Sequence, residues 1–294
     1  MLIDCHVHCA LSGSGQIPKN LMASDSEARQ QWFKNLAALY VRHDIRAVRD
    51  GGDKYGVGEV FKKVAEDAGI VFKTPIKALY KKGCYGSFLG EGLADLSDCR
   101  QAMKALLSKK PDHIKIIQSG IMSFETYGEA DGLEFTEEEF TYLIRCGHDA
   151  DLKVMVHVNT PEGIRMAILA GADTIEHGYC IDDACIALLK EYDCTWIPTL
   201  APFANIAKCR EDHFLAAYRS ISQCYYDHHR RQVRKAVESG VKVALGSDSG
   251  ATLVDHGKAT LEELSYLKDC GLSEGEVFQN SCEVLGCSPE ECSV

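Results

Sequence analysis

The side chains best suited to chemistry in this sequence are four histidines and one aspartate, each at the end of a short apolar run. They are His6, His8, His157, His177 and Asp248. Imidazole nitrogen and carboxylate oxygen are ligands of zinc, and also of manganese and iron. Residues i and i+2 of a strand face the same way, so His6 and His8 can point to one spot. A single histidine at a strand end is more often structural, but the repetition at four strand ends favours a metal site.

Lys115 is unusual because it stands among Ile114, Ile116 and Ile117 in the run HIKIIQSG. An ammonium group in such a place is costly unless it is paired or loses its proton. Two interpretations stay open. In the first, the lysine is ion-paired or reaches solvent. In the second, its uncharged amine captures carbon dioxide, and the resulting carbamate is an anionic ligand able to bridge two cations.

Eight short β-rich runs alternate with helical patterns along the chain. The runs are Met1–Cys9, Ile45–Asp50, Ile70–Leu79, His113–Ser119, Lys153–Val158, Thr174–His177, Thr195–Leu200 and Val241–Ser247. Several, such as VMVHV and VKVAL, are almost wholly apolar, which is typical of strands buried on both faces of a parallel sheet. Helical patterns occupy Glu27–Tyr40, Gly58–Ala68, Thr160–Ala170, Ile181–Glu191, Tyr225–Ser239 and Leu261–Cys270, and capping boxes at Thr136/Glu139 and Ser273/Glu276 open two more.

This alternation predicts an α/β fold, a single (β/α)8 TIM barrel that makes one domain of residues 1–294. The rival arrangement, a doubly wound sheet, is disfavoured because no GxGxxG turn follows the first run. Active sites of such barrels lie at the C-terminal ends of the strands. The five candidate ligands and Lys115 all fit one barrel register with their side chains at that end.

Composition narrows the class of partner. The chain has 294 residues, 14 cysteines and a formal net charge of −11, which disfavours nucleic acid and anionic lipid. No apolar run approaches the roughly 20 residues of a membrane helix. The start MLIDCHVHC does not resemble a signal peptide, and many cysteines without an export signal indicate a reducing compartment. We therefore expect a cytoplasmic protein that acts on a small molecule, and a homo-oligomer is compatible with the sequence.

The sequence resembles the metal-dependent amidohydrolase superfamily, and within it the imidazolonepropionase-like and prolidase-like branch. The matching stretches run in the order of that branch over nearly the whole chain. They are IDCHVH, IRAVRDGG, PDHIKIIQSGIMS, FTEEEF, VMVHV, AGADTIEHG, ALGSDSG and DHGKATLEELSYLKDCGLS. The resemblance implies two divalent ions, with zinc favoured and manganese or iron as alternatives. The first would be held by His6, His8, the Lys115 carbamate and Asp248, and the second by the same carbamate with His157 and His177.

The sequence departs from the pattern of that branch in three places. Most members have a small β-sandwich built from both chain ends, and here the first metal motif begins at His6, so we expect the sandwich to be lacking. A Gly-Gly-His segment often follows the third strand, whereas this chain has Lys82-Gly83-Cys84-Tyr85-Gly86. His157 is followed by Val158-Asn159 where small residues are usual. The last two departures bear on the class of substrate.

The expected reaction is hydrolysis by a metal-bound hydroxide. Two cations lower the pKa of a shared water until hydroxide forms at neutral pH, and they polarise the carbonyl that it attacks. Asp248 is the candidate catalytic residue, which would pass a proton to the leaving amine, unless it serves only as a ligand. The predicted substrate is an amide: a dipeptide, an N-acyl amino acid or a cyclic amide. Lactone or ester hydrolysis and ring deamination are the alternatives, and a binding protein without catalysis is a third.

Three loop residues are candidates for binding the substrate. Tyr85, Tyr127 and His256 follow the third, fourth and eighth predicted strands, and they could stabilise an oxyanion or hold a substrate carboxylate. Glu176 directly precedes His177 in its strand, so we expect it to face the helices in a structural role. The pair His228-His229 lies in a helix beside two arginines and is expected at the surface.

Overall fold

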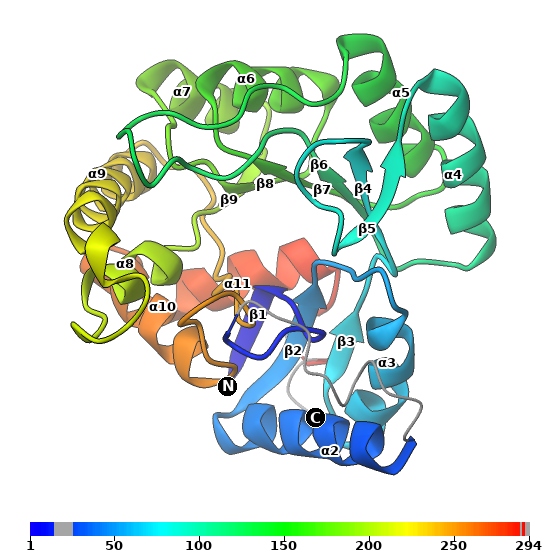
Figure 1. Cartoon of the computed structure of the whole chain (residues 1–294), viewed down its shortest axis with the longest axis horizontal. Coiled ribbons are helices and arrows are strands. Elements are labelled where there is room, and N and C mark those ends of the chain that lie inside the picture. Colours follow the sequence, from blue (N-terminus) through cyan, green and yellow to red (C-terminus); the bar gives the residue numbers. More distant parts are fainter. Residues whose placement is uncertain (15–25, 289, 292–294) are drawn as a thin grey trace.

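Strands and helices alternate along the chain, with the helices on the outside of the molecule and the strands toward its centre (Figure 1). The computed structural model describes residues 1–14, 26–288, 290 and 291. The strands are β1 (Leu2–Val7), β2 (Ile45–Asp50), β3 (Val71–Lys73), β4 (Ala78–Lys81), β5 (Gly90–Leu93), β6 (Ile114–Ile117), β7 (Val154–Val158), β8 (Thr174–His177) and β9 (Thr195–Ile197). The helices are α2 (Ser26–Arg42), α3 (Val57–Asp67), α4 (Leu96–Ser108), α5 (Glu137–His148), α6 (Pro161–Ala170), α7 (Asp183–Glu191), α8 (Ala201–Ala207), α9 (Arg219–Glu238), α10 (Lys258–Asp269) and α11 (Glu274–Leu285), with a short 3-10 helix at Ala216–Tyr218.

The strands form two sheets in which neighbours run parallel. One has the order β1-β2-β3 and the other the order β5-β4-β6-β7-β8-β9. Because most strands are followed by a helix that returns the chain to the same edge, their C-terminal ends gather on one side. The prediction of an α/β fold with parallel strands is confirmed.

The third predicted strand is interrupted in the structure. The run Ile70–Leu79 divides into β3, which pairs with β2, and β4, which pairs with β6. Pro75 has no N–H to donate, and Ile76 has a φ of 67°, so neither continues a strand. The prediction of one continuous strand is therefore wrong. A further strand, β5, pairs with the outer edge of β4 and was not predicted.

The eighth predicted strand, residues 241–247, lies between β9 and β1 but does not form a regular strand among the described residues. Isolated parallel bridges connect this segment to both neighbours, joining Val243 to Trp196 of β9 and Ser249 to Val7 of β1. The segment therefore links the two sheets. Helices α4 and α8 were not predicted either, and the buried face of α4 consists of Cys99, Ala102, Met103 and Leu106.

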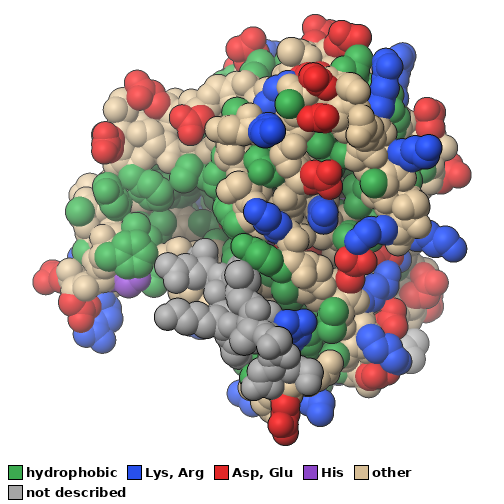
Figure 2. Space-filling model, turned by 45° about the vertical axis from the view of Figure 1, so that its right-hand side comes forward, with side chains coloured by type: hydrophobic (Ala, Val, Ile, Leu, Met, Phe, Trp, Pro, Cys, Tyr) green, Lys and Arg blue, Asp and Glu red, His purple; other side chains and the backbone are tan. Residues whose placement is uncertain are grey.

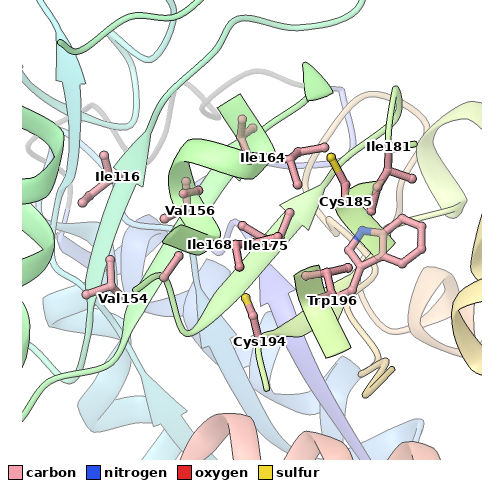
Figure 3. Close-up of a cluster of buried hydrophobic side chains, with 14 of the residues drawn as sticks. Ile116, Val154, Val156, Ile164, Ile168, Ile175, Ile181, Cys185, Cys194 and Trp196 are labelled. Carbon is pink, nitrogen blue, oxygen red and sulfur yellow. The ribbon is translucent and has the colours of Figure 1, made fainter. Parts of the chain in front are cut away.

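The core between the six-stranded sheet and its helices explains why these runs are so apolar. Side chains of β6, β7, β8 and β9 pack against those of α6 and α7 (Figure 3). Helix α6 follows β7 after a tight turn, because Thr160 accepts a hydrogen bond from the Gly163 N–H and Pro161 occupies the first turn. No described helix combines the length and apolar character needed to cross a membrane.

Candidate metal and catalytic site

A cavity of about 260 Å³ opens where the predicted site residues meet. Five of the six predicted metal ligands line it, namely His8, Lys115, His157, His177 and Asp248. The sixth, His6, lies directly behind them. Its ring centroid is 5.3 Å from that of His8 and 4.8 Å from that of His177. The structure therefore brings together residues that are up to 242 positions apart in the sequence, from His6 to Asp248.

His6, His8 and Asp248 form the tightest part of the cluster. The Nε2 atoms of His6 and His8 lie 3.5 Å and 3.3 Å from Oδ1 of Asp248, and one donor atom from each residue falls within 4.8 Å of the others. His6 Nε2 and His8 Nδ1 are buried without a hydrogen-bond partner in the described chain. Burial holds the pKa of His6 well below its usual value, so the ring is neutral, which is the form that binds a metal. This donor set fits a divalent cation.

Glu176 fixes the orientation of His6. Its Oε2 accepts a hydrogen bond from His6 Nδ1 at 2.6 Å, which leaves Nε2 of His6 with its lone pair toward Asp248. Oε1 of Glu176 accepts from Arg49 at 2.8 Å and from Thr174 at 2.5 Å. The expectation that Glu176 faces the helices is wrong. His177 has a φ of 66° and leaves the extended conformation, so the alternation of faces does not hold at the end of this strand.

Lys115 lies in β6 with its amine enclosed. The residue is 1% exposed, and Nζ has neither a hydrogen bond nor a salt bridge among the described residues. Burial lowers the pKa of Lys115 from 10.5 to about 8, although the nearby carboxylate of Glu176 opposes this shift. The amine therefore does not reach solvent, and no carboxylate of the described chain is within ion-pair distance of it. An unpartnered amine that loses its proton more readily than an exposed lysine fits the capture of carbon dioxide.

His157 and His177 form the other side of the cluster, with ring centroids 4.5 Å apart. Burial lowers the pKa of His157 to about 3 and holds that of His177 well below its usual value. His177 Nδ1 lies 2.7 Å from the hydroxyl of Thr199. His177, Thr199 and Asp248 all adopt positive φ angles, of 66°, 51° and 58°, which non-glycine residues seldom do. Such strain is common where a functional side chain must be held in place.

Two buried carboxylates that sequence reasoning missed support this strained backbone. Asp4 accepts hydrogen bonds from the backbone N–H of Ser247 at 2.9 Å and from the hydroxyl of Thr260 at 2.6 Å, and burial raises its pKa to about 6. Glu263 of α10 accepts from the backbone N–H groups of Leu200 and Ala201, directly after Thr199, at 2.9 Å and 2.8 Å. The signal in the sequence was a charged residue inside an otherwise apolar run or helix face.

The three predicted substrate-binding residues lie in different places. Tyr85 lines the cavity, and its ring centroid is 5.4 Å from that of His157. Tyr127 is 49% exposed, and its ring centroid lies 4.8 Å from that of Tyr225 beside a second pocket. His256 is buried away from the cavity, where its ring nitrogens lie 2.9 Å from the hydroxyl of Tyr40 and from the carbonyl oxygen of Leu11. The structure thus brings only Tyr85 to the cluster.

His229 is also placed differently from the expectation. It is 1% exposed, and its Nε2 donates a hydrogen bond to the carbonyl oxygen of Pro198 at 2.8 Å. Burial lowers its pKa to about 3. The prediction that this histidine lies at the surface is wrong because it occupies the inner face of α9, against Trp196 and Tyr179. The two neighbouring arginines fall on other faces of the helix.

Residues 2–283 match the Amidohydrolase family, and the chain belongs to that family. An uncharacterized protein of Mycobacterium bovis is 31% identical over 291 residues, which cover 96% of this chain and 71% of that protein. Ochratoxinase of Aspergillus niger is 24% identical over 300 residues, which cover 92% of this chain and 60% of that enzyme. The family resemblance read from the sequence is confirmed.

Among solved structures, the fold is similar to that of a Xaa-Pro dipeptidase crystallised with methionine in its active site. The TM-score is 0.80 at 22% identity, over 97% of this chain and 75% of that one. The structural neighbours include a putative prolidase from Bifidobacterium longum and ochratoxinase of Aspergillus niger, whose structure gives a TM-score of 0.74 at 19% identity, over 99% of this chain and 70% of that one. At this level of identity the likeness concerns the fold. Membership of the Amidohydrolase family supports hydrolysis of amide bonds.

Proposed function

We propose that this chain is a binuclear metallohydrolase that cleaves a carbon–nitrogen bond of an amide. The observation that carries the proposal is the enclosed amine of Lys115, which has no partner among the described residues and lines one cavity with His8, His157, His177 and Asp248. An ammonium group would repel two divalent ions at this place, whereas a carbamate would bind both. Ring deaminases of the superfamily that the sequence resembles usually have one metal and no lysine in the corresponding strand, so the presence of Lys115 disfavours ring deamination.

The residues that would hold the ions are those predicted from the sequence. His6, His8, Asp248 and the Lys115 carbamate would hold the first, and the carbamate with His157 and His177 would hold the second. The donor set of imidazole nitrogen and carboxylate-type oxygen suits zinc, with manganese or iron as alternatives. Divalent ions bound there would supply an activated water at neutral pH and polarise the scissile carbonyl.

The remaining chemistry belongs to side chains of this protein. Asp248 is 14% exposed on its side chain and lies at the cavity floor, where it can take a proton and deliver it to the leaving nitrogen. Tyr85 packs on His157, and its hydroxyl makes no hydrogen bond within the described chain, so it can donate one to the oxygen of the carbonyl under attack. Glu176 and Thr199 hold His6 and His177 in orientation, as partners behind metal ligands commonly do.

We also propose that the two sheets belong to one closed (β/α)8 barrel and one domain. Support comes from the segment 241–249, which bridges β9 to β1, and from the run Ile70–Leu79, which pairs with β2 at one end and with β6 at the other. Counted in this way, eight strand positions form a ring around the cavity floor, and β5 lies outside it.

The test is a screen of amides with protein purified in the presence of zinc or manganese. Substrates are N-acyl arylamines, dipeptides, N-acyl amino acids and lactams, with lactones in parallel. We expect turnover of at least one amide, loss of that turnover on chelation, and recovery on return of the metal. Turnover that persists in metal-free protein, or hydrolysis of lactones alone, contradicts the proposal.

A further inference from the structure

The cavity changes character between its floor and its walls. The floor consists of the histidines, Lys115 and Asp248, whereas the walls above it are built from large apolar side chains. These include Ile121, Met122, Phe124, Phe203, Ile206 and Phe214. They come from the loop after β6, from α8 and from the segment after α8. Hydrophobic side chains also gather around the hollow on the face shown in Figure 2.

Apart from the hydroxyl of Tyr85, the polar groups on the walls are already engaged. Asn159 donates its amide N–H to the carbonyl oxygen of Gly120 at 3.0 Å, and its Oδ1 accepts from the backbone N–H of Tyr179 at 3.4 Å. The hydroxyl of Tyr179 donates to the carbonyl oxygen of Thr199 at 2.8 Å. Groups held in this way by the protein have little capacity left for a substrate.

The charges around the cavity do not suit a substrate carboxylate. Among the described residues, Lys115 is the only lysine or arginine that lines it, and that amine stands at the floor. The acidic residue of the lining is Asp248, and the divalent ions that the proposed function places beside it would be held by the ligands of the floor, so the walls offer no cation to a carboxylate. An ionised group placed among the apolar walls would lose its hydration without gaining a partner.

The size of the cavity sets the size of the ligand. A cavity of roughly 150 Å³ lined by apolar side chains holds benzene. The cavity here measures about 260 Å³, which leaves room for one ring and an amide group.

We infer that the substrate is an uncharged amide that carries an aromatic or comparably bulky apolar group, and that amides with a free carboxylate beside the scissile bond are poor substrates. This inference rests on the proposed function, because it assumes that the amide is cleaved at the floor of this cavity. Among the substrates predicted from the sequence, this inference disfavours dipeptides and N-acyl amino acids. The walls determine this specificity, whereas the residues of the floor carry out the reaction.

The first experiment compares two substrates that differ by one carboxylate. N-acetyl-2-phenylethylamine and N-acetyl-phenylalanine share one ring and the scissile amide, and both release acetate, which chromatography measures. We expect kcat/KM of the metal-loaded enzyme to be larger for the neutral amide by about tenfold or more, because burying a carboxylate without a partner costs hydration free energy. Equal or faster hydrolysis of the acid overturns the inference and leaves the metallohydrolase proposal standing.

Binding is measured separately so that the two proposals can fail independently. Calorimetry with the metal-loaded Asp248→Asn variant should show tighter binding of the neutral compound. If no amide is hydrolysed but this preference is found, the proposed function fails while the specificity of the cavity is supported. Tighter binding of the acid overturns the inference whether or not hydrolysis occurs.

A pair of arginine variants tests the role of charge in the cavity, with one arginine at the cavity mouth and the other, as the control, away from it. Phe214 is 73% exposed, so Phe214→Arg should fold normally and offer a cation to a substrate carboxylate. We expect it to shift the ratio of kcat/KM toward the acid by about threefold to fivefold, the size of a partly exposed ion pair. Leu169→Arg adds the same charge at a 58% exposed site on α6 that does not line the cavity, and it should leave the ratio unchanged. Equal shifts in both variants, or no shift in Phe214→Arg, overturn the inference.

Discussion

The carboxylate of Glu176 lies 2.6 Å from Nδ1 of His6, and both side chains are completely buried. This contact determines which nitrogen of His6 is free to bind a metal, because Nδ1 must donate its proton to the carboxylate. Arg49 balances the charge of Glu176 from the other side at 2.8 Å. Glu176, buried in an ion pair with Arg49, therefore orients His6 at one end of the proposed metal site.

Replacement of Glu176 by glutamine should weaken the metal site without removing a ligand. We expect metal affinity or turnover to fall by about 10-fold to 100-fold, as is usual when the partner of a metal-binding histidine is lost. Elemental analysis and titration with zinc measure the effect on protein whose near-UV circular dichroism is unchanged. Glu91→Gln, at a side chain that is 47% exposed, is the control. Normal metal affinity and turnover in Glu176→Gln would show that this contact does not support the site.

Replacement of Asp248 by asparagine should separate metal binding from proton transfer. An amide oxygen can still bind a cation, but it cannot carry a proton. Turnover should therefore fall by about 100-fold or more, the usual contribution of a general acid–base. Asp255→Asn, at an exposed position of the same loop, should keep full activity. If Asp248→Asn holds its metal and turns over at the normal rate, Asp248 has no part in proton transfer.

Loss of the Thr199 hydroxyl should act mainly on His177, because its other neighbour, the hydroxyl of Tyr179 at 3.1 Å, also donates to the carbonyl oxygen of Thr199. Thr199→Val removes the group 2.7 Å from Nδ1 of His177 and keeps the shape of the side chain. We expect the second metal to be bound about 10-fold more weakly, while the first is bound normally. Stepwise titration of metal-free protein distinguishes the two sites. An equal weakening of both sites would point to a general loss of structure rather than to an oriented ligand.

Histidines that are buried in neutral form should make the metal-free protein less stable in mild acid. Burial lowers the pKa of His229 to about 3, whereas in the unfolded chain it is about 6.5. Below pH 6.5 the unfolded state thus binds more protons, and each such histidine removes about 1.4 kcal/mol of the free energy of unfolding per pH unit until the folded pKa is reached. Glu263, whose pKa burial raises to about 8, acts in the opposite direction between about pH 4.5 and 8.

The comparison of His229→Gln with the wild-type protein isolates the contribution of one histidine. Urea unfolding at pH 7 and at pH 5 should show a smaller loss of stability in the variant than in the wild type, by about 1–2 kcal/mol. Glutamine can still donate to the carbonyl oxygen of Pro198, so the fold should be retained. The same loss in both proteins would mean that His229 does not stay neutral in the folded state.

The positions of the candidate ligands could be predicted from the sequence because strand ends of a parallel fold meet on one side. Five of the six line one cavity, and His6 packs behind them. Their role as ligands stays a prediction. Tyr127 and His256 were harder to place, since both stand on loops whose paths depend on tertiary contacts. In the structure Tyr127 contacts the ring of Tyr225, and His256 contacts the hydroxyl of Tyr40.

The errors in the sequence interpretation have local physical causes. Pro75 and Ile76 interrupt the third strand, and positive φ angles at His177 and Asp248 break the alternation of faces on which the orientation of Glu176 was inferred. Asp4 and Glu263 each stand as a charged residue in an otherwise apolar run or helix face, but the backbone N–H groups that they bind could not be inferred from the sequence. A positive φ at a non-glycine residue cannot be inferred from residue type.

The metal content of the wild-type protein and of Lys115→Ala tests the central claim most directly. Elemental analysis of protein purified with zinc should give about two equivalents per chain in the wild type, because six donor residues exceed the four ligands of one tetrahedral zinc. Lys115→Ala should lose at least one equivalent and its activity, and acetate or propionate at high concentration should restore part of that activity by replacing the carbamate. Two equivalents in Lys115→Ala with normal turnover, or a wild-type protein that hydrolyses amides without metal, would contradict the account.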